Sequence, residues 1–279
     1  IVDMASRFTS NTRKEVLENI LLQIDDGKLY VDATDLESRF SGHIEAGNKY
    51  RFSHDKGVGS ICVSLGKLKK LLPLMEGIVD IHFQKKDDVF GMRIGEFFLE
   101  GENPDNFPVM MKKKGISFTV TNIANKLQFV GRALSTVSAM STLCGICFDL
   151  KNNNLAGADG NRLHMVSLNE DAKLKRVDTL TIVPAKILSV GKYLTGNVML
   201  IEDEKKEDQS TVFELAVPGC IQCCVTSQSI EGQYPHYQSV VPVDYKNKFV
   251  TRTDDIIPIL RKALAHVGDD YRVVFVEFG

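Results

Sequence analysis

Apolar and polar residues alternate along many short stretches of the chain, and this period of two predicts β-strands. The stretches 208–217 ("DQSTVFELAV") and 91–100 ("GMRIGEFFLE") are examples. Elsewhere apolar residues recur at helical spacing, which predicts helices over 64–75, 121–140, 184–194 and 254–267. Short strands with a few helices segregated to one face predict an α+β fold.

The predicted elements recur in the same order with a long period. "GKLYVDATDLESRF" (27–40) and "NNLAGADGNRLHMV" (153–166) both read as a strand, a turn and an arginine, and their aspartates, Asp35 and Asp159, lie 124 residues apart. "VSLGKLKKLLPLM" is repeated as "IVPAKILSVGKYL", and "FFLEGENPDNFPVM" as "SQSIEGQYPHYQSVV". A third copy begins near residue 247. The repeats predict three domains, 1–114, 115–246 and 247–279, of which the first lacks its start and the last only begins.

Composition narrows the class of protein. The 279 residues are 43% hydrophobic and 25% charged, which is typical of a globular protein rather than a disordered or fibrous one. We find no apolar run long enough for a membrane helix and no signal peptide. Six cysteines in a chain of this size do not suggest a disulfide scaffold, so we expect a reducing, cytoplasmic location.

Two CxxC spacings, "CGIC" (144–147) and "CIQC" (220–223), suggest a zinc site at first sight. Both stretches read as strands, and side chains at positions i and i+3 of a strand point to opposite faces. We therefore favour buried small hydrophobic residues over a metal site, and we expect no cofactor.

Sequence signatures of catalysis are missing. The chain has no G-x-S-x-G, H-E-x-x-H or Walker A motif, and "GVGSICVSLGK" has the wrong spacing for a phosphate loop. The six histidines form no local cluster, and the carboxylates are scattered. A site assembled from distant residues stays open, but the sequence favours a protein that is not an enzyme.

Charge is distributed unevenly between the predicted helices and the rest of the chain. The net charge is −2, which by itself argues against nucleic-acid binding. The four predicted helices hold 9 basic and 2 acidic residues, however, leaving 25 of the 34 basic and 34 of the 36 acidic residues elsewhere. Amphipathic helices often expose lysines. If the repeats place these helices on one surface, that surface would attract phosphate without reading sequence.

The order of motifs resembles the bacterial sliding clamp, the beta subunit family of DNA polymerase III. The similar segments are "DGKLYVDATDLESRF", "LCGICFDLKNNNLAGADGNRLHMVS", "TIVPAKIL" and "IEGQYPHYQSVVP". The resemblance covers essentially the whole chain. It implies repeated clamp-type domains, each with two helices on one face of antiparallel sheets, and a homodimeric ring around duplex DNA.

The function that the resemblance implies is that of a DNA polymerase processivity factor in DNA replication. Its partners would be double-stranded DNA, the replicative polymerase, the clamp loader and other proteins with a clamp-binding motif. The DNA-facing basic residues would be Arg13, Lys67, Lys69, Lys70, Lys126, Arg132, Lys186, Lys192, Arg261 and Lys262.

The family's "TDG-x-RL" turn forms part of a hydrophobic pocket for partner peptides. The matching residues here are Leu143, Ala158, Gly160, Asn161, Arg162, Leu163, Pro235 and Val240. Ala158 stands where the family has threonine, Asn161 where it has histidine, and Ser239 where it has arginine, so peptide preference should differ.

Two other hypotheses stay open from the sequence alone. One is a clamp-fold adaptor that binds peptides without encircling DNA, suggested by the short third repeat. The other is a metal-dependent enzyme that uses the CxxC pairs.

Overall fold

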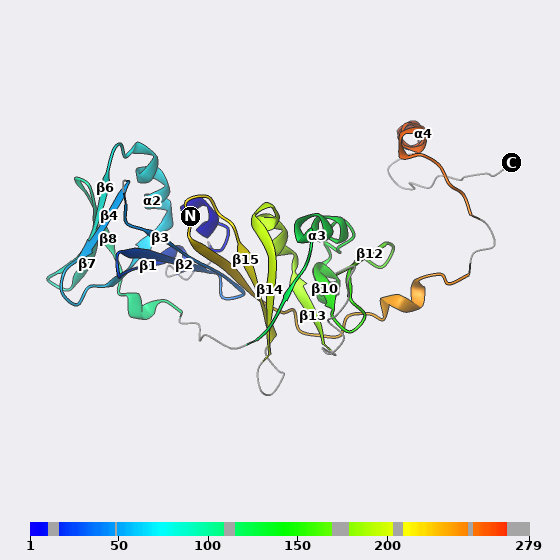
Figure 1. Ribbon diagram of the computed structural model, residues 1–279, viewed down its shortest axis with the longest axis horizontal. Helices are drawn as coiled ribbons and strands as arrows, with labels where there is room; N and C mark the ends of the chain where they lie inside the picture. The colour runs from blue at the N-terminus through cyan, green and yellow to red at the C-terminus, as the bar shows by residue number, and fades with distance from the viewer. Residues whose placement is uncertain are drawn as a thin grey trace. The chain divides into compact units, whose positions relative to one another are not determined.

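The structure of the chain is a computed structural model, which describes residues 1–10, 17–47, 49–108, 115–168, 179–202, 209–244 and 248–266. The chain forms two compact units, Ile1–Pro235 and His236–Gly279 (Figure 1). The predicted domain boundaries adjoin segments 109–114 and 245–247, which lie outside the described residues.

The first half of the larger unit is mostly antiparallel strands with two short helices. Its elements are α1 (Val2–Ala5), β1 (Asn19–Asp25), β2 (Lys28–Thr34), β3 (Ser38–Glu45), β4 (Tyr50–His54), β5 (Ser60–Ser64), α2 (Leu65–Leu71), η2 (Leu72–Leu74), β6 (Val79–Lys86), β7 (Val89–Ile94), β8 (Phe97–Gly101) and η3 (Pro104–Asn106), where η marks a 3₁₀ helix.

The second half repeats this plan with longer 3₁₀ segments. Its elements are β9 (Ile116–Thr119), α3 (Ile123–Gly131), η4 (Ser138–Cys144), β10 (Gly145–Asp149), β11 (Asn154–Ala158), β12 (Leu163–Ser167), β13 (Leu180–Pro184), η5 (Ala185–Tyr193), β14 (Leu194–Glu202), β15 (Gln209–Leu215) and β16 (Gln222–Gln228).

One eight-stranded sheet joins the two halves, in the order β5-β1-β2-β3-β16-β15-β14-β9. Its seam is the antiparallel pair β3–β16, in which Phe40 lies opposite Val225 and Gly42 opposite Cys223. Two four-stranded sheets, β4-β6-β7-β8 and β12-β11-β10-β13, complete the unit. Only β4 and β6 pair in parallel among the strands that the structure describes. The α+β fold class is confirmed.

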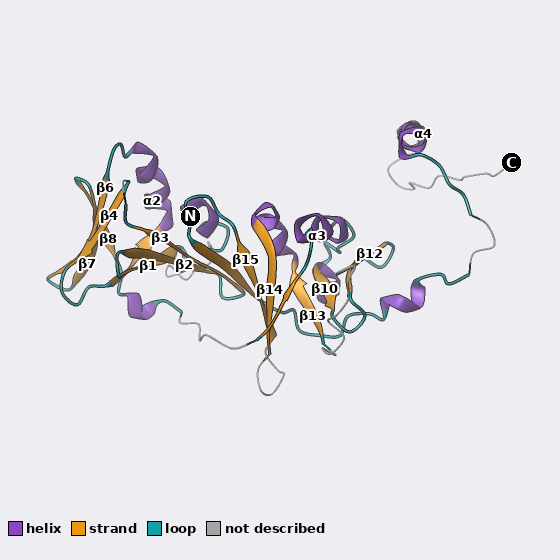
Figure 2. Cartoon of the chain, viewed as in Figure 1, coloured by secondary structure: helices purple, strands orange, loops and turns teal. Residues whose placement is uncertain are grey.

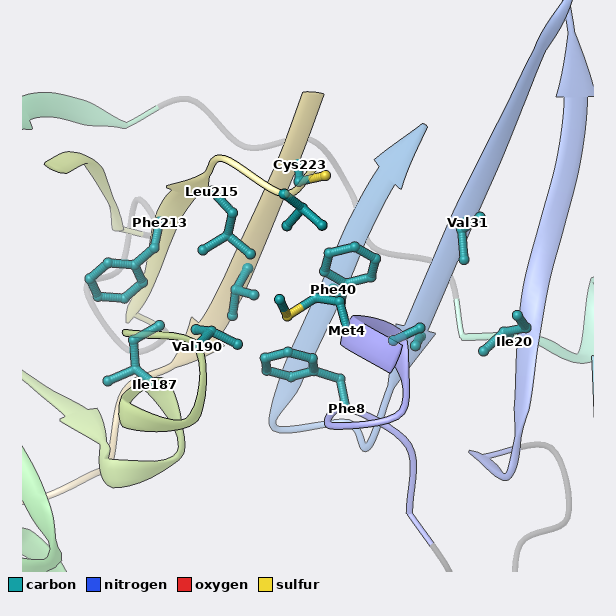
Figure 3. Packing of buried hydrophobic residues seen from close by; sticks show 14 of the residues in the cluster. Met4, Phe8, Ile20, Val31, Phe40, Ile187, Val190, Phe213, Leu215 and Cys223 are labelled. Carbon is teal, nitrogen blue, oxygen red and sulfur yellow. The ribbon is translucent and has the colours of Figure 1, made fainter. Parts of the chain in front are cut away.

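A continuous hydrophobic core crosses the seam. Phe8 and Phe40 from the first half are fully buried, and their rings stack with centroids 6.3 Å apart. Figure 3 shows these rings facing Val190 and, further along, Phe213 from the second half. Burial of side chains of this size contributes about 1.5–3 kcal/mol each, so the two halves stabilise each other.

Two turns that the sequence pairs as copies have the same hydrogen-bond chemistry. The Asp35 carboxylate accepts hydrogen bonds from the backbone N–H groups of Glu37 and Ser38, at 3.1 and 2.7 Å. The Asp159 carboxylate accepts from the residues at the same spacing, Asn161 and Arg162, at 2.9 and 2.8 Å. Both aspartates thus close the connection between two paired strands, β2–β3 and β11–β12.

Two predicted elements differ in the structure. The strand predicted over 91–100 is a hairpin, because Gly95, with φ of +56°, turns the chain between β7 and β8. The helix predicted over 121–140 ends at Gly131, and a 3₁₀ segment starts at Ser138. Between them the Ser135 hydroxyl accepts the N–H of Val137, a local bond that competes with helical hydrogen bonding.

The smaller unit contains η6 (Tyr237–Val240) and α4 (Thr253–His266), which corresponds to the predicted helix 254–267. The strand predicted to follow it lies outside the described residues. None of the helices in the described part of the chain is long and apolar enough to span a membrane.

Candidate functional site

The helices of the larger unit form one continuous row. Helix α2 packs against α1, and the Arg7 side chain just after α1 donates a hydrogen bond to the carbonyl of Ser189 in η5. Element η5 in turn packs against α3. Figure 2 shows α2, the N-terminal helix and α3 on the same side of this unit, with the strands on the other. Elements α2, η5 and α3 contain no acidic residue.

Helix α2 presents its lysines to solvent because its apolar residues anchor it. Leu65 and Leu68 are buried, and the Ser64 hydroxyl caps the first turn by accepting the N–H of Lys67 at 3.4 Å. Lys67, Lys69 and Lys70 are all exposed. Lys69 lies within 3.6 Å of the Asp3 carboxylate, a solvent-exposed pair that contributes little stability.

A cleft of about 690 Å³ runs between α3 and η5. Arg7, Arg132 and Lys192 are its charged lining residues, and no acidic side chain lines it. All three are exposed. Three cations around an open cleft make a site suited to a phosphate group.

Arg7 was not among the residues expected from the sequence, because the helices analysed for charge did not include the one at the N-terminus. Arg7 lies in the stretch "VDMASRF", and a comparison of charges that included this stretch would have found it.

Two of the predicted DNA-facing lysines are held by contacts within the chain. The Lys126 ammonium donates to the carbonyl of Leu168 at 2.7 Å. The Lys186 ammonium forms an ion pair with Asp35 and lies 5.4 Å from the centre of the Phe8 ring. These contacts tie neighbouring elements together, and we leave both lysines out of the basic surface.

The remaining basic residues belong elsewhere. Arg13 lies outside the described residues. Arg261 and Lys262 are exposed on α4, in the smaller unit. The basic surface, as we define it from here on, therefore consists of Arg7, Lys67, Lys69, Lys70, Arg132 and Lys192.

The turn at 158–163 has the geometry of a rigid pocket wall. Gly160 adopts φ of +92°, which glycine tolerates best. The Arg162 guanidinium donates to the second oxygen of Asp159 through Nε and Nη2, at 2.9 and 2.7 Å. The head of Arg162 is thus fixed beside the turn, while 61% of its side chain stays exposed to solvent.

Two further segments meet this turn. The hydroxyl of the buried Tyr234 lies near the backbone of Ala158, which places the exposed Pro235 close to the turn. A Cβ on Gly232 would lie 2.8 Å from the Thr142 methyl, so the same loop also runs beside the half-buried Leu143. The structure thus gathers the predicted pocket residues of the larger unit. Val240 is 67% exposed and belongs to the smaller unit.

The Asp159 turn should depend on pH. Its hydrogen bonds from the Asn161 amide and the Arg162 side chain lower the pKa of Asp159 to about 2. An unfolded aspartate has a pKa near 3.9, so the stabilisation is present above that value and is lost as pH falls through about 2. We expect NMR amide shifts of Asn161 and Arg162 to titrate near pH 2. The Asp159→Asn variant should lack this transition, and a midpoint near 4 in the natural protein would contradict the assignment.

No family model matches the chain. The beta sliding clamp of Buchnera aphidicola subsp. Rhopalosiphum padi is 23% identical over 264 residues, covering 91% of this chain and 67% of that protein. The chain therefore spans about two thirds of the length of this curated relative. The structure of the DNA polymerase III subunit beta from Pseudomonas aeruginosa superposes with a TM-score of 0.76 at 19% identity, covering 97% of this chain and 72% of that one.

The chain is similar to the bacterial sliding clamps in sequence and in fold. The structure of the Helicobacter pylori beta clamp bound to a DNA ligase peptide has the same fold, with a TM-score of 0.74 at 19% identity over 95% of this chain and 73% of that one. The clamp resemblance found in the sequence is thus confirmed.

The prediction that both CxxC stretches are strands was wrong at their first cysteines. Cys144 is the last residue of η4 and Cys220 follows a turn before β16, and the sulfurs of Cys220 and Cys223 both lie close to Gly42. All six cysteines are free thiols. In the described part of the chain, no group of three or more histidine, cysteine, aspartate or glutamate residues is arranged to hold a metal ion.

Proposed function

We propose that the chain acts as a sliding clamp: a non-catalytic processivity factor that encircles duplex DNA and tethers the replicative polymerase. The observation that carries this proposal is the basic surface on a row of helices, of which α2, η5 and α3 contain no acidic residue, set on a clamp fold.

Such a surface suits a partner that is bound without recognition of its base sequence. Duplex DNA carries one negative charge about every 1.7 Å along its axis. Lysine and arginine side chains can therefore contact a phosphate wherever the protein lies along the duplex. Phosphate contacts carry no sequence information and impose no fixed register. A ring lined in this way holds DNA while moving along it.

The pocket at the Asp159 turn is the proposed docking site for partner peptides from the polymerase, the clamp loader and other clamp-binding proteins. Leu143, Leu163 and Pro235 would supply apolar walls, and the aliphatic stem of Arg162 would add to them while its head stays hydrated. Ala158, Gly160 and Asn161 shape the turn between these walls.

Ring formation requires a second copy of the chain. Strand β8 ends the four-stranded sheet of the first half, and Phe97 and Phe98 on it are each 51% exposed. An edge strand with exposed aromatic residues favours pairing with another strand. We infer that this edge contacts the partner copy.

We also propose that the chain consists of three domains, 1–114, 115–246 and 247–279. We propose a cytoplasmic location for the protein, because its six thiols would stay reduced there.

The test uses nicked circular duplex DNA onto which a clamp loader places the protein. Because a closed ring is held by topology, we expect the bound protein to survive gel filtration and to be lost when the DNA is linearised. Blocking both ends of the linear DNA with bulky proteins should restore retention. Retention on linear DNA with open ends would contradict encirclement and would favour an adaptor that binds peptides without encircling DNA.

A further inference from the structure

The thiols of Cys220 and Cys223 lie close together at the start of β16, both beside Gly42. Cys220 ends a turn, in which its N–H donates to the carbonyl of Val217 at 3.0 Å. The Cys220 thiol also lies 3.2 Å from the carbonyl of His43, to which it can donate. Cys220 is half-buried, whereas Cys223 is 1% exposed and is one of the core residues drawn in Figure 3.

The backbone opposite the two sulfurs leaves room for them. Gly42 on β3 pairs with Cys223 across the seam. A Cβ at position 42 would lie 2.9 Å from the Cys223 sulfur and 3.2 Å from the Cys220 sulfur. Both sulfurs thus occupy the space that a larger residue at position 42 would fill, next to the seam that joins the halves of the unit.

The two thiols differ in reactivity. The hydrogen bond from Cys223 lowers the pKa of Cys220, while the same bond, together with burial, raises the pKa of Cys223. A partly exposed thiol with a lowered pKa beside a buried partner is the arrangement in which the first sulfur attacks and the second resolves.

The other cysteines lack this arrangement. The Cys144 thiol points to the carbonyl of Val137 at 3.3 Å, and Cys147 is buried in β10, where burial raises the pKa of its thiol. Burial also raises the pKa of Cys62 to about 12 and raises the pKa of Cys224. The "CGIC" sequence therefore serves as an internal control with the same spacing and different geometry.

We propose that Cys220 and Cys223 are a redox-active dithiol that closes reversibly to a disulfide at the seam between β3 and β16. With a small-molecule disulfide such as oxidised glutathione as oxidant, the Cys220 thiolate attacks one sulfur and releases one glutathione thiolate. The Cys223 sulfur then attacks Cys220 of the mixed disulfide, gives up its proton to solvent and releases the second glutathione. The protein loses two electrons and two protons, and the oxidised glutathione becomes two thiols.

The experiment incubates the full chain in glutathione buffers of increasing oxidising strength, traps the remaining thiols by alkylation and maps the peptides by mass spectrometry. We expect the 220–223 peptide to lose two hydrogens while the 144–147 peptide is alkylated at both cysteines. In the reduced protein, we expect Cys220 to be alkylated at least ten times faster than Cys223 or Cys147.

Three variants make the result decisive. Cys220→Ser changes the more exposed partner and should abolish the disulfide, and the double change Cys144→Ser with Cys147→Ser should leave it unchanged. Cys223→Ala tests the resolving sulfur, and it should accumulate the mixed disulfide of Cys220 with glutathione. Equal oxidation of the two CxxC sequences, or a 220–223 peptide that stays reduced in pure oxidised glutathione, would overturn the proposal. The outcome of this experiment does not depend on whether the chain acts as a sliding clamp.

Discussion

Replacing Gly157 by alanine should destabilise the larger unit by roughly 3 kcal/mol or more, at the upper end of the cost of overpacking a core. Gly157 lies in β11, directly under α3, and an added Cβ would sit 2.3 Å from the backbone carbonyl oxygen of Val130. Real Cβ atoms do not approach so closely, and a carbonyl inside a helix cannot turn away without breaking its hydrogen bond. The helix must therefore lift off the strand.

Gly191 provides a matched control for this substitution. It lies in η5, next to the same helix, but a Cβ there would meet no atom within 4 Å. We expect Gly191→Ala to change the free energy of unfolding by less than about 0.5 kcal/mol. Urea denaturation followed by circular dichroism compares the two variants, and equal midpoints would show that α3 and β11 are not packed as described.

The fold could be predicted from the sequence wherever the signal is local or repeated. The turns at Asp35 and Asp159 use the same side-chain chemistry, so comparing the two copies identified both. Alternation identified β15 directly. Alternation alone could not separate β7 from β8, because the turn between them is made by Gly95 in the left-handed region, and a glycine within an alternating pattern can also mark a bulge.

The candidate site was less predictable because tertiary contacts decide what a charged side chain does. Lys186 and Lys192 are six positions apart on η5, yet Lys186 pairs with Asp35 from the other half while Lys192 lines the open cleft. No pattern within the segment distinguishes them. The same reason explains Arg7, whose role depends on η5 lying next to α1. The contact between Cys220 and Cys223 depends on a turn that the strand-like sequence "CIQCCVTS" did not reveal.

Neutralising part of the basic surface should weaken binding to duplex DNA in a way that depends on salt and not on base sequence. We choose Lys67, Lys70, Arg132 and Lys192, because Arg7 donates a hydrogen bond to Ser189 and Lys69 forms an ion pair with Asp3. If each of the four meets one phosphate, changing all four to glutamine should lower the magnitude of the slope of log K against log salt by about 3.6, or about 0.9 per contact. The measurement is fluorescence anisotropy with two duplexes of unrelated sequence, from about 50 to about 200 mM salt.

The control variant changes four exposed lysines on strands and loops, Lys49, Lys56, Lys86 and Lys151, to glutamine. It alters the net charge by the same amount, so any long-range effect of charge on binding is common to both variants. If the basic surface contacts DNA, we expect a large change in the slope of log K against log salt for the helix variant and a small change for the control. Both duplexes should be affected alike. Equal slopes for the two variants would mean that the protein's overall charge governs binding. A change confined to one duplex would mean that these side chains read bases, which a clamp that slides along DNA cannot do.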